Sequence, residues 1–396
     1  MRITELKLKK FKGFFDLDLH LGSQNLFVII GENGAGKSSI LEALNKLLSE
    51  LDYNLNGNKR HILLNEDIQI DANETECFIS LLMKQNSELK WSYSKSKEVN
   101  TKHTIKYYAD DNKIDIKNGI NKEKFIQQLE KNFGKIDITR RIPTYLYFKS
   151  DYIPNADDFI QWYKDLVLFE SYLESSNSKF EFSLKEAIEL AIKKFTGISI
   201  TARIADDFKT IKPVFRHKGR DLDFSHLSDG EKRIIDIVGK IVSNFVISFQ
   251  SNKKKLLEFS GIVLIDEIEK HLHPLWQRNI LPELVKTFPN VQFIITSHSP
   301  QVISNISREN VIIINNFEIQ KDIPHTLGRD TNSILYDIFK LSKRPEIYQK
   351  KINNIYELLD NEDINNAKTE LNNLIFDLGE NDIEIKRIQT QIDLME

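Results

Sequence analysis

A glycine-rich segment near the N-terminus has the residue types and the spacing of a phosphate-binding loop. Residues 31–38 read Gly-Glu-Asn-Gly-Ala-Gly-Lys-Ser; an apolar run precedes them, and residues of helical character follow. A strand that ends in glycines and opens into a helix directs several backbone N–H groups, and the positive end of the helix dipole, at one point. We expect Lys37 to neutralise nucleotide phosphates and the Ser38 hydroxyl to be a ligand of Mg²⁺. The expected nucleotide contacts are Asn33, Gly34, Ala35, Gly36, Lys37, Ser38 and Ser39.

Two acidic residues follow an apolar run later in the chain. Asp266 and Glu267 come directly after Ile262–Ile265, a sequence typical of a strand that is buried on both faces. At the end of such a strand Asp266 can hold Mg²⁺, and Glu267 can act as general base toward the water that attacks the γ-phosphate. Two adjacent acids at a surface strand end would instead be solvated. The apolar strand favours the chemical interpretation.

Two further segments offer groups for phosphate recognition. The string Leu-Ser-Asp-Gly-Glu places Ser228, Gly230 and Glu231 at the start of a helix-like stretch, where a hydroxyl and free N–H groups can meet a phosphate. As a lone string it is also an ordinary turn with a helix cap. His298 follows another apolar run, residues 291–296, from which it can reach the γ-phosphate. A lone histidine after a strand is more often structural. Neither segment alone therefore indicates phosphate binding, and the argument depends on all the motifs together.

Composition narrows the classes of protein that remain. The chain has 396 residues, of which 40% are hydrophobic and 29% charged, and its net charge is −3. This balance argues against a surface that grips nucleic acid throughout, although it allows a local basic patch. No apolar run reaches the ~18–20 residues that span a bilayer, so we expect no membrane partner. The single cysteine, Cys77, excludes an internal disulfide framework and predicts a reducing, cytoplasmic location.

In their order along the chain (31–38, 227–231, 262–267 and His298), the four motifs resemble the ABC-type ATPase head, and its SMC- and RecF-like branch more closely than a transporter subunit. The resemblance implies an α/β fold: a P-loop ATPase head with a β-subdomain, an inserted helical lobe and a helical C-terminal extension. It implies ATP and Mg²⁺ as cofactors and hydrolysis to ADP and phosphate, with Glu267 as general base and His298 as switch histidine. It also implies a head-to-head dimer, in which Ser228 and Gly230 of one subunit cap the ATP bound by the other.

Two details of the resemblance concern metal ions. The head normally carries a glutamine that links Mg²⁺ to a regulatory lobe, and Gln69 is the candidate for this third metal contact beside Ser38 and Asp266. His271 and His273 offer an alternative metal site by their spacing. The resemblance instead assigns their segment to the loop that crosses the dimer interface.

The elements that position these motifs divide the chain into four predicted regions. Residues 1–110 form the N-terminal part of the head, with the phosphate loop and a β-subdomain. Residues 111–205 form an inserted, mainly helical lobe with a core strand near 145–149. Residues 206–320 form the C-terminal part of the head with the three later motifs. Residues 321–396 are helical and suited to oligomerisation or partner docking.

The region between the first two motifs separates this chain from true SMC proteins. About residues 50–220 hold a β-region and a compact helical lobe instead of a long coiled coil, which excludes a chromosome-scale tether. Further strings resemble a family of AAA/ABC-like ATPases that serves Septu-type and retron-associated anti-phage defence systems. These strings are Phe159–Tyr163, Asp266–Pro274, Gly328–Leu335, Arg344–Glu346 and Ala367–Leu371.

This second resemblance implies a partner and leaves one alternative open. It implies a sensor and scaffold that controls a separately encoded HNH nuclease, because no His-Asn-His arrangement is found in this sequence. It also implies a higher homo-oligomer, with DNA or another nucleic acid reached through the complex. The alternative is a RecF/SMC-like DNA-repair ATPase that binds DNA directly. A transporter subunit is the least favoured hypothesis.

Overall fold

The chain forms two compact units, Met1–Arg329 and Asp330–Glu396. The computed structural model describes residues 1–82, 88–97, 103–109, 112–114, 145–152, 159–167, 184–204, 211–246, 257, 259–339 and 344–395. Much of the predicted helical insertion at 111–205 lies outside these residues. The four region boundaries expected from the sequence stay predictions.

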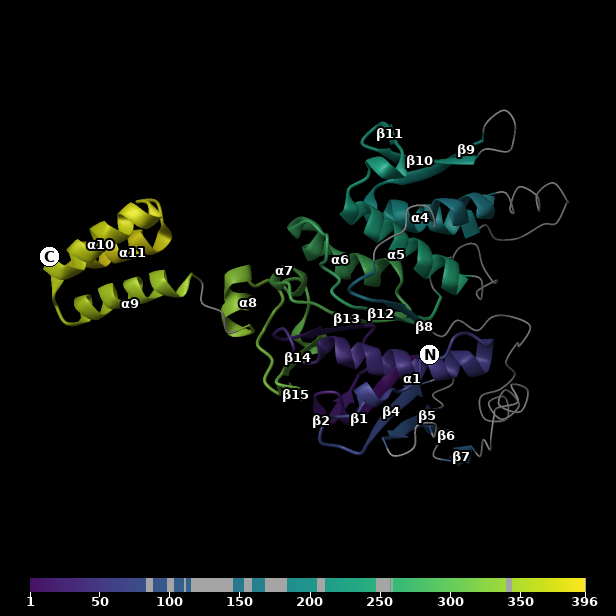
Figure 1. Cartoon of the computed structure of the whole chain (residues 1–396). Helices are drawn as coiled ribbons and strands as arrows, with labels where there is room; N and C mark the ends of the chain where they lie inside the picture. The colour runs from purple at the N-terminus through teal and green to yellow at the C-terminus, as the bar shows by residue number, and fades with distance from the viewer. Residues whose placement is uncertain are drawn as a thin grey trace. The chain divides into compact units, whose positions relative to one another are not determined.

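A six-stranded sheet lies at the centre of the first unit, with the order β15-β14-β3-β13-β12-β8 (Figure 1). Its strands are β3 (Leu26–Ile30), β8 (Tyr145–Phe148), β12 (Gly261–Ile265), β13 (Val291–Thr296), β14 (Val311–Asn315) and β15 (Glu318–Ile319). The neighbours from β14 to β8 are parallel, and β15 returns antiparallel. Every residue of β3, β12 and β13 is buried. Their apolar sequences explain this, because a parallel sheet is covered on both faces.

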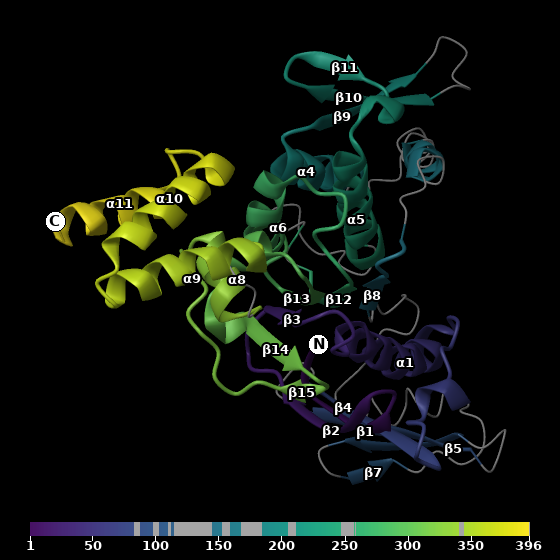
Figure 2. The same ribbon diagram turned by 60° about the vertical axis from the view of Figure 1, so that its left-hand side comes forward.

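Helices cover both faces of this sheet. The helix α1 (Lys37–Asn56) contacts β8, β12 and β13 on one face. On the other face lie α5 (Asp229–Val246) and α6 (Pro274–Thr287), as Figures 1 and 2 show. The helix α4 (Leu184–Thr196) packs on α5 and α6, and α7 (Pro300–Ile303) contacts α6. Apolar residues recur along α5 at helical spacing, which buries one side of it. They are Ile234, Ile235, Ile237, Val238, Ile241, Val242 and Phe245.

A second six-stranded sheet, antiparallel, packs against the same helix α1, and its order is β2-β1-β4-β5-β6-β7. Its strands are β1 (Arg2–Phe11), β2 (Phe14–His20), β4 (Glu74–Leu82), β5 (Glu88–Ser96), β6 (His103–Ala109) and β7 (Asn112–Ile114). One hydrophobic core joins both sheets through α1. Cys77 is fully buried in this core, and burial raises the pKa of its thiol, so it serves as a small apolar residue.

A small three-stranded antiparallel sheet completes the described part of the first unit, with the order β11-β10-β9. Its strands are β9 (Ser199–Ile204), β10 (Ile211–His217) and β11 (Arg220–Leu222). The helix α4 contacts β9, and a short 3-10 turn (Phe224–His226) leads from β11 toward α5. This sheet therefore leads the chain directly into the helix that begins at the Ser-Asp-Gly motif.

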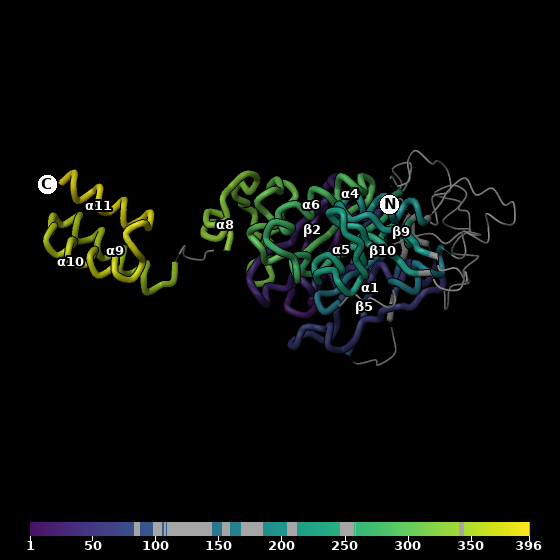
Figure 3. The backbone as a smooth tube through the Cα atoms, turned by 90° about the horizontal axis from the view of Figure 1, so that it is seen from above, coloured from purple at the N-terminus to yellow at the C-terminus, as the bar shows by residue number. Residues whose placement is uncertain are grey.

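The second unit is helical, as expected from its sequence. Its helices are α8 (Thr331–Asp337), α9 (Glu346–Asp360), α10 (Ile364–Leu378) and α11 (Ile383–Met395), the last three lying side by side in the tube of Figure 3. Apolar residues three or four apart on α9, α10 and α11 form a core of their own. This core is Ile352, Ile355, Leu359, Ala367, Leu371, Leu374, Ile385, Ile388 and Ile392. Among all the described residues, no helix has the length and apolar character needed to span a membrane.

Candidate functional site

Three of the predicted motifs meet at the carboxyl edge of the parallel sheet. The segment 31–38 leaves β3, Asp266 and Glu267 leave β12, and His298 follows β13. Because β3, β13 and β12 are adjacent parallel strands, their carboxyl ends lie at one edge. This is the edge at which open α/β sheets bind ligands. Lys37, Ser38, Asp266, Glu267, Thr296 and His298 are called the P-loop site below.

The loop between β3 and α1 has a backbone that only glycine tolerates at two points. Gly31 has φ 154°, and a Cβ there would lie 2.1 Å from the carbonyl oxygen of Ile314. Gly36 has φ 102°, and a Cβ there would lie 2.6 Å from the ring of Phe14. The loop therefore packs closely against the Ile314 backbone at one point and against the Phe14 ring at the other. The predicted contacts Asn33, Gly34 and Ala35 lie in this loop, and Ser39 lies in the first turn of α1.

Lys37 is buried in the loop, and the loop's own carbonyl groups hold its ammonium. Its Nζ donates hydrogen bonds to the carbonyl oxygens of Gly31 at 3.0 Å and Glu32 at 2.7 Å. Burial lowers the pKa of Lys37, while nearby carboxylates, that of Asp266 foremost, act in the opposite direction. The Lys37 ammonium is therefore already placed at the loop, where phosphate oxygens can replace the two carbonyl oxygens as its hydrogen-bond acceptors.

Hydrogen bonds connect α1, β12 and β13 across the site. The Ser38 hydroxyl donates to Asp266 Oδ1 at 3.0 Å, and the Thr296 hydroxyl donates to the same oxygen at 2.5 Å. Two oxygen ligands in adjacent positions of an octahedral Mg²⁺ site lie on the order of 3 Å apart, since each Mg–O bond is about 2.0–2.1 Å. The Ser38 and Asp266 oxygens therefore fit a magnesium ion.

Glu267 has a left-handed backbone, with φ 51°. Its N–H donates to Thr296 Oγ1 at 2.9 Å, and its carbonyl oxygen accepts from Arg233 Nη2 at 3.1 Å. Its carboxylate lies 3.8 Å from His298 Nε2. A non-glycine residue in this conformation persists only where its surroundings hold it, and such residues gather at functional sites.

Sequence reasoning assigned no role to Thr296 or Arg233. Arg233 lies on α5 and is buried, with its Nε and Nη1 free of hydrogen-bond partners in the described part of the chain. Burial lowers the pKa of its guanidinium, and the carboxylates of Glu269, Glu267 and Asp266 oppose that shift. The only signals available in the sequence were a hydroxyl at the end of an apolar strand and an arginine directly after the Ser-Asp-Gly-Glu-Lys string.

The Ser-Asp-Gly motif opens α5 through a capping box, away from the P-loop site. The Ser228 N–H and hydroxyl both donate to Glu231 Oε2 at 2.8 Å, and the Glu231 N–H donates to Ser228 Oγ at 3.3 Å. A Cβ on Gly230 would lie 2.9 Å from the carbonyl oxygen of His271, so this position packs closely against the segment after β12. None of the described hydrogen bonds joins Ser228, Gly230 or Glu231 to Lys37 or Asp266.

Gln69 is not brought to the P-loop site by any described contact. Its N–H donates to the Lys10 carbonyl oxygen at 2.9 Å, and its own carbonyl oxygen accepts from Lys97 Nζ at 3.2 Å. The strand beside Asp266 is β8, whose Phe148 carbonyl accepts from the Asp266 N–H at 2.8 Å. The proposed metal role of Gln69 therefore has no geometric support here.

Of the two histidines after β12, His273 caps a helix in this conformation. His273 Nδ1 accepts from the Leu275 N–H at 3.3 Å and caps α6, which begins at Pro274. In the described residues, the one group of acidic and histidine side chains close enough for a metal is Glu5, Asp18 and His20.

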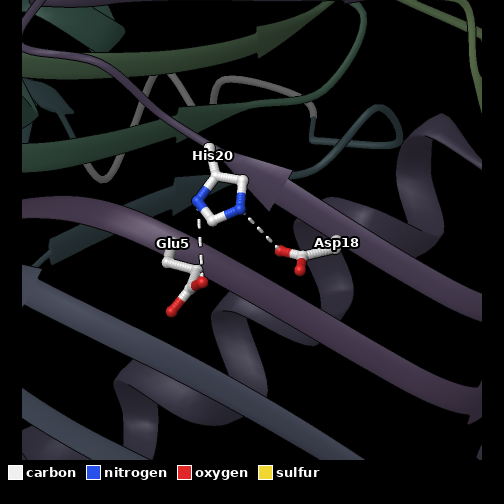
Figure 4. Close-up of side chains that lie close together, drawn as sticks. All are labelled: Glu5, Asp18 and His20. Atoms are coloured by element: carbon white, nitrogen blue, oxygen red, sulfur yellow. Dashed lines mark ion pairs between the residues drawn. The ribbon is translucent and has the colours of Figure 1, made fainter.

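The Glu5–Asp18–His20 cluster is a set of ion pairs, as Figure 4 shows. His20 faces Glu5 with Nδ1 at 3.5 Å and Asp18 with Nε2 at 3.2 Å, so two different ring nitrogens meet the two acids. Lys7 Nζ lies 2.8 Å from Glu5 and 3.4 Å from Asp18. Lys7 supplies a positive charge to both acids, and the two ring nitrogens of His20 face different acids, so ion pairing accounts for the cluster.

Comparison with known proteins gives relatives along most of the chain. A family profile described as "AAA domain, putative AbiEii toxin, Type IV TA system" matches residues 26–304. The retron Vc95 probable ATPase of Vibrio cholerae serotype O1 biovar El Tor is 25% identical over 439 residues, covering 89% of this chain and 81% of that protein. The Septu protein PtuA of Bacillus thuringiensis is 24% identical over 384 residues, covering 91% and 90%.

Solved structures share the fold at low identity. An SMC head, crystallised with the C-winged helix domain of ScpA, gives a TM-score of 0.53 at 15% identity and covers 82% of this chain and 98% of that chain. With the family match, this confirms the predicted fold class and the resemblance to PtuA and ABC-like ATPases.

Proposed function

The chain belongs to the family described as AAA domain, putative AbiEii toxin, Type IV TA system, and from this premise we propose that it is an ATP-hydrolysing subunit of a bacterial anti-phage defence complex. The observation that carries the proposal is the convergence of Lys37, Ser38 and Asp266 at one sheet edge with an acid and a histidine beside them. The relatives named retron probable ATPase and Septu protein support the defence role.

The loop and its lysine bind the nucleotide in this proposal. Backbone N–H groups of residues 33–39 surround the phosphates, and Lys37 exchanges the carbonyl oxygens of Gly31 and Glu32 for phosphate oxygens. Ser38 and Asp266 hold Mg²⁺, which neutralises charge on the phosphates when bound. Thr296 fixes the orientation of the Asp266 carboxylate through its short hydrogen bond.

Glu267 is the general base. Hydrolysis needs an acceptor for a proton of the attacking water, and a carboxylate whose backbone is held from both sides is placed for that task. Thr296 and Arg233 hold the Glu267 peptide groups, and His298 lies close to the carboxylate. His298 then contacts the γ-phosphate and links its presence to the position of Glu267.

The site becomes complete in a dimer of heads. Ser228 and Gly230 stand at the start of α5 with a hydroxyl and helix N–H groups, yet no described contact joins them to the P-loop of their own chain. In the proposed assembly they cap the γ-phosphate of ATP that is bound to a second copy. Shared ATP closes the dimer, and hydrolysis opens it again.

The defence role requires a partner. We infer that a separately encoded HNH nuclease binds the ATPase and that the closed and open dimers regulate it. The second unit, with a core of its own, serves oligomerisation or partner docking, in keeping with its predicted role. Regions 1–110 and 206–320 then form the head, with the predicted lobe between them.

The assembly step gives the sharpest test. The variant Glu267→Gln should form dimers in ATP and Mg²⁺ and stay monomeric at the head without nucleotide, as measured by light scattering on a size-exclusion column. Adding Lys37→Ala to it should abolish the ATP effect. Dimers that form equally well without nucleotide would contradict a dimer of heads that is held together by shared ATP.

A second test distinguishes control of a partner nuclease from direct DNA binding by the ATPase. Cells with the ATPase and its neighbouring HNH nuclease should resist phage in plating assays, and Lys37→Ala should remove that resistance. Salt-sensitive duplex-DNA binding by the purified ATPase alone would instead favour the direct DNA-repair function.

A further inference from the structure

A cavity of about 560 Å³ lies beside the Ser-Asp-Gly motif. Its walls come from the tip of the β10–β11 hairpin, the start of α5 and the segment from β12 to α6. Residues on its walls include His217, Lys218, Ser228, Gly230, Glu231 and His271. Cavities that bind small molecules typically measure ~300–1,000 Å³, so this volume suits a ligand larger than one phosphate group. It is called the signature cavity below.

Lys218 stands at the tip of the hairpin that borders the signature cavity. The register pairs His217 with Arg220, so Lys218 and Gly219 alone form the turn. Both have left-handed backbones, with φ 49° and 78°, as a tight hairpin turn of this type requires. The turn therefore presents the Lys218 side chain at the end of the sheet and beside Ser228.

The charge on Lys218 is uncompensated in the described structure. Three other cations of the same small sheet have partners there, whereas Arg220, outside the cavity lining, has none among the described residues. These pairs are Arg203 with Asp221, Arg216 with Asp221, and Lys212 with Asp223. Lys218 has no ion pair and no hydrogen bond in the part of the chain that the structure describes.

The acids near the signature cavity are already paired. The Glu231 carboxylate accepts from Ser228 and lies 3.2 Å from His217 Nδ1, and Asp229 lies 3.4 Å from Lys232. Lys232 therefore balances Asp229, whereas Glu231 is bound by a serine and by a histidine that is charged only when protonated. Lys218 is a cation of the lining that has no ion pair among the described residues, and a phosphate group is a complementary partner for it.

We propose that the signature cavity receives the phosphate tail of an ATP bound to the P-loop of a second copy of the chain, and that Lys218 is its charged ligand there. Lys218 acts beside Ser228 and Gly230, and it supplies the full positive charge that a hydroxyl and N–H groups lack. The inference rests on the proposed function, because it needs the dimer of heads. It assigns to the hairpin tip a role in the nucleotide site of the partner.

Single variants test whether Lys218 matters to turnover. Lys218→Glu should slow ATP hydrolysis by about 10–100-fold, because a charge-assisted contact is lost, and Lys218→Arg should keep most of the rate. Arg220→Glu is the matched control, since it makes the same charge change on the same hairpin outside the cavity lining. Equal effects of Lys218→Glu and Arg220→Glu, or no effect of Lys218→Glu, would overturn the proposal.

Mixed subunits test whether Lys218 acts on the partner's nucleotide. Lys37→Ala and Lys218→Glu should each be slow alone, yet an equal mixture should recover to about a quarter of the wild-type rate, because half of the dimers are mixed and each holds one complete site. In that site the P-loop comes from Lys218→Glu and the signature cavity from Lys37→Ala. A lysine that serves its own P-loop gives no recovery.

A second mixture separates this inference from the dimer itself. A mixture of Ser228→Arg and Lys37→Ala tests whether ATP is shared between two heads, and it leaves the hairpin unchanged. Recovery with Ser228→Arg but not with Lys218→Glu would reject the role of Lys218 and keep the proposed function. No recovery in either mixture would reject the dimer with shared ATP and the inference together. Recovery in both supports the inference.

Discussion

The P-loop site and the signature cavity differ in how far the chain satisfies its own polar groups. In the P-loop site Lys37, Ser38 and Thr296 all donate hydrogen bonds within the chain, and the strands β3, β12 and β13 that end at the site are buried. The signature cavity is open, and a cation at its border has no partner among the described residues. The first site is ordered before a ligand arrives, whereas the second has a charge that only an outside group can meet.

This difference indicates two kinds of recognition in one molecule. A ligand of the P-loop site exchanges existing bonds for new ones, so its gain depends on the better geometry and charge of the phosphates. A ligand of the signature cavity brings the missing charge itself. A chain with one site of each kind is suited to pair with a second copy. We therefore expect variants of the P-loop site to lose nucleotide binding or hydrolysis, and variants of the signature cavity to lose dimer formation.

The largest effect should come from the P-loop site. Glu267→Gln should reduce ATP hydrolysis by ~10²–10⁴-fold, because the base that accepts the water proton is lost while the shape of the site is kept. ATP affinity should remain close to wild type. Phosphate release and equilibrium binding of a fluorescent ATP analogue measure the two quantities, and unchanged turnover would remove Glu267 from the mechanism.

The next pair of variants contrasts the two regions directly. Lys37→Ala should weaken ATP binding to the isolated head by about 10–100-fold, because it removes a charged phosphate contact. Ser228→Arg should leave that binding unchanged and prevent ATP-dependent dimers between its own copies, since both signature cavities of such a dimer are filled. Calorimetric titration and light scattering measure the two outcomes. Loss of nucleotide binding in Ser228→Arg would place both regions in one site of one chain.

Thr296 tests the internal order of the P-loop site. Thr296→Val removes two buried hydrogen bonds, so it should lower the free energy of unfolding by ~1–3 kcal/mol and slow hydrolysis by about tenfold. Thr287→Val is the matched control, because the Thr287 hydroxyl is buried without a hydrogen-bond partner in the described chain. It should be neutral or slightly stabilising. Thermal unfolding and phosphate release check both variants, and similar behaviour would contradict the assigned role.

The smallest effect on chemistry should follow from loss of the second unit. Both regions lie within Met1–Arg329, and the helices of the second unit have their own core. Deletion of residues 330–396 should therefore leave ATP binding and the rate of hydrolysis within about twofold, while it reduces the size of the assembly or the binding of the nuclease. Unchanged assembly and nuclease binding would end the scaffold role of this unit.

The sequence was most informative where an apolar run ends in polar residues. Each run that precedes the phosphate loop, Asp266 and His298 forms a buried parallel strand, so the meeting of these segments at one edge was predictable from parallel pairing alone. The helical second unit was predictable from composition in the same way. The comparisons confirm the fold class and the family resemblance, whereas the site roles remain to be tested.

The parts that the sequence concealed depend on tertiary register. Thr296 reaches Asp266 only because β13 lies beside β12 in one alignment, and Arg233 reaches Glu267 only because α5 packs across the same sheet. Lys218 is an ordinary turn residue until folding sets the hairpin beside Ser228. The metal role of Gln69 stays a prediction, because hydrogen bonds join it to Lys10 and Lys97 and no described one joins it to the P-loop site.

The capping box at Ser228 has a consequence for selectivity in the cell. Its hydroxyl is held by the Glu231 carboxylate, which is itself an anion. Free phosphate, sulfate and free nucleotides would have to displace that internal competitor without a second protein surface, so we expect the cavity to bind these small anions weakly. A nucleotide that arrives already fixed on another copy loses less freedom on binding and can win this exchange. We therefore expect the cap to favour a nucleotide presented by another copy over one that is free in solution.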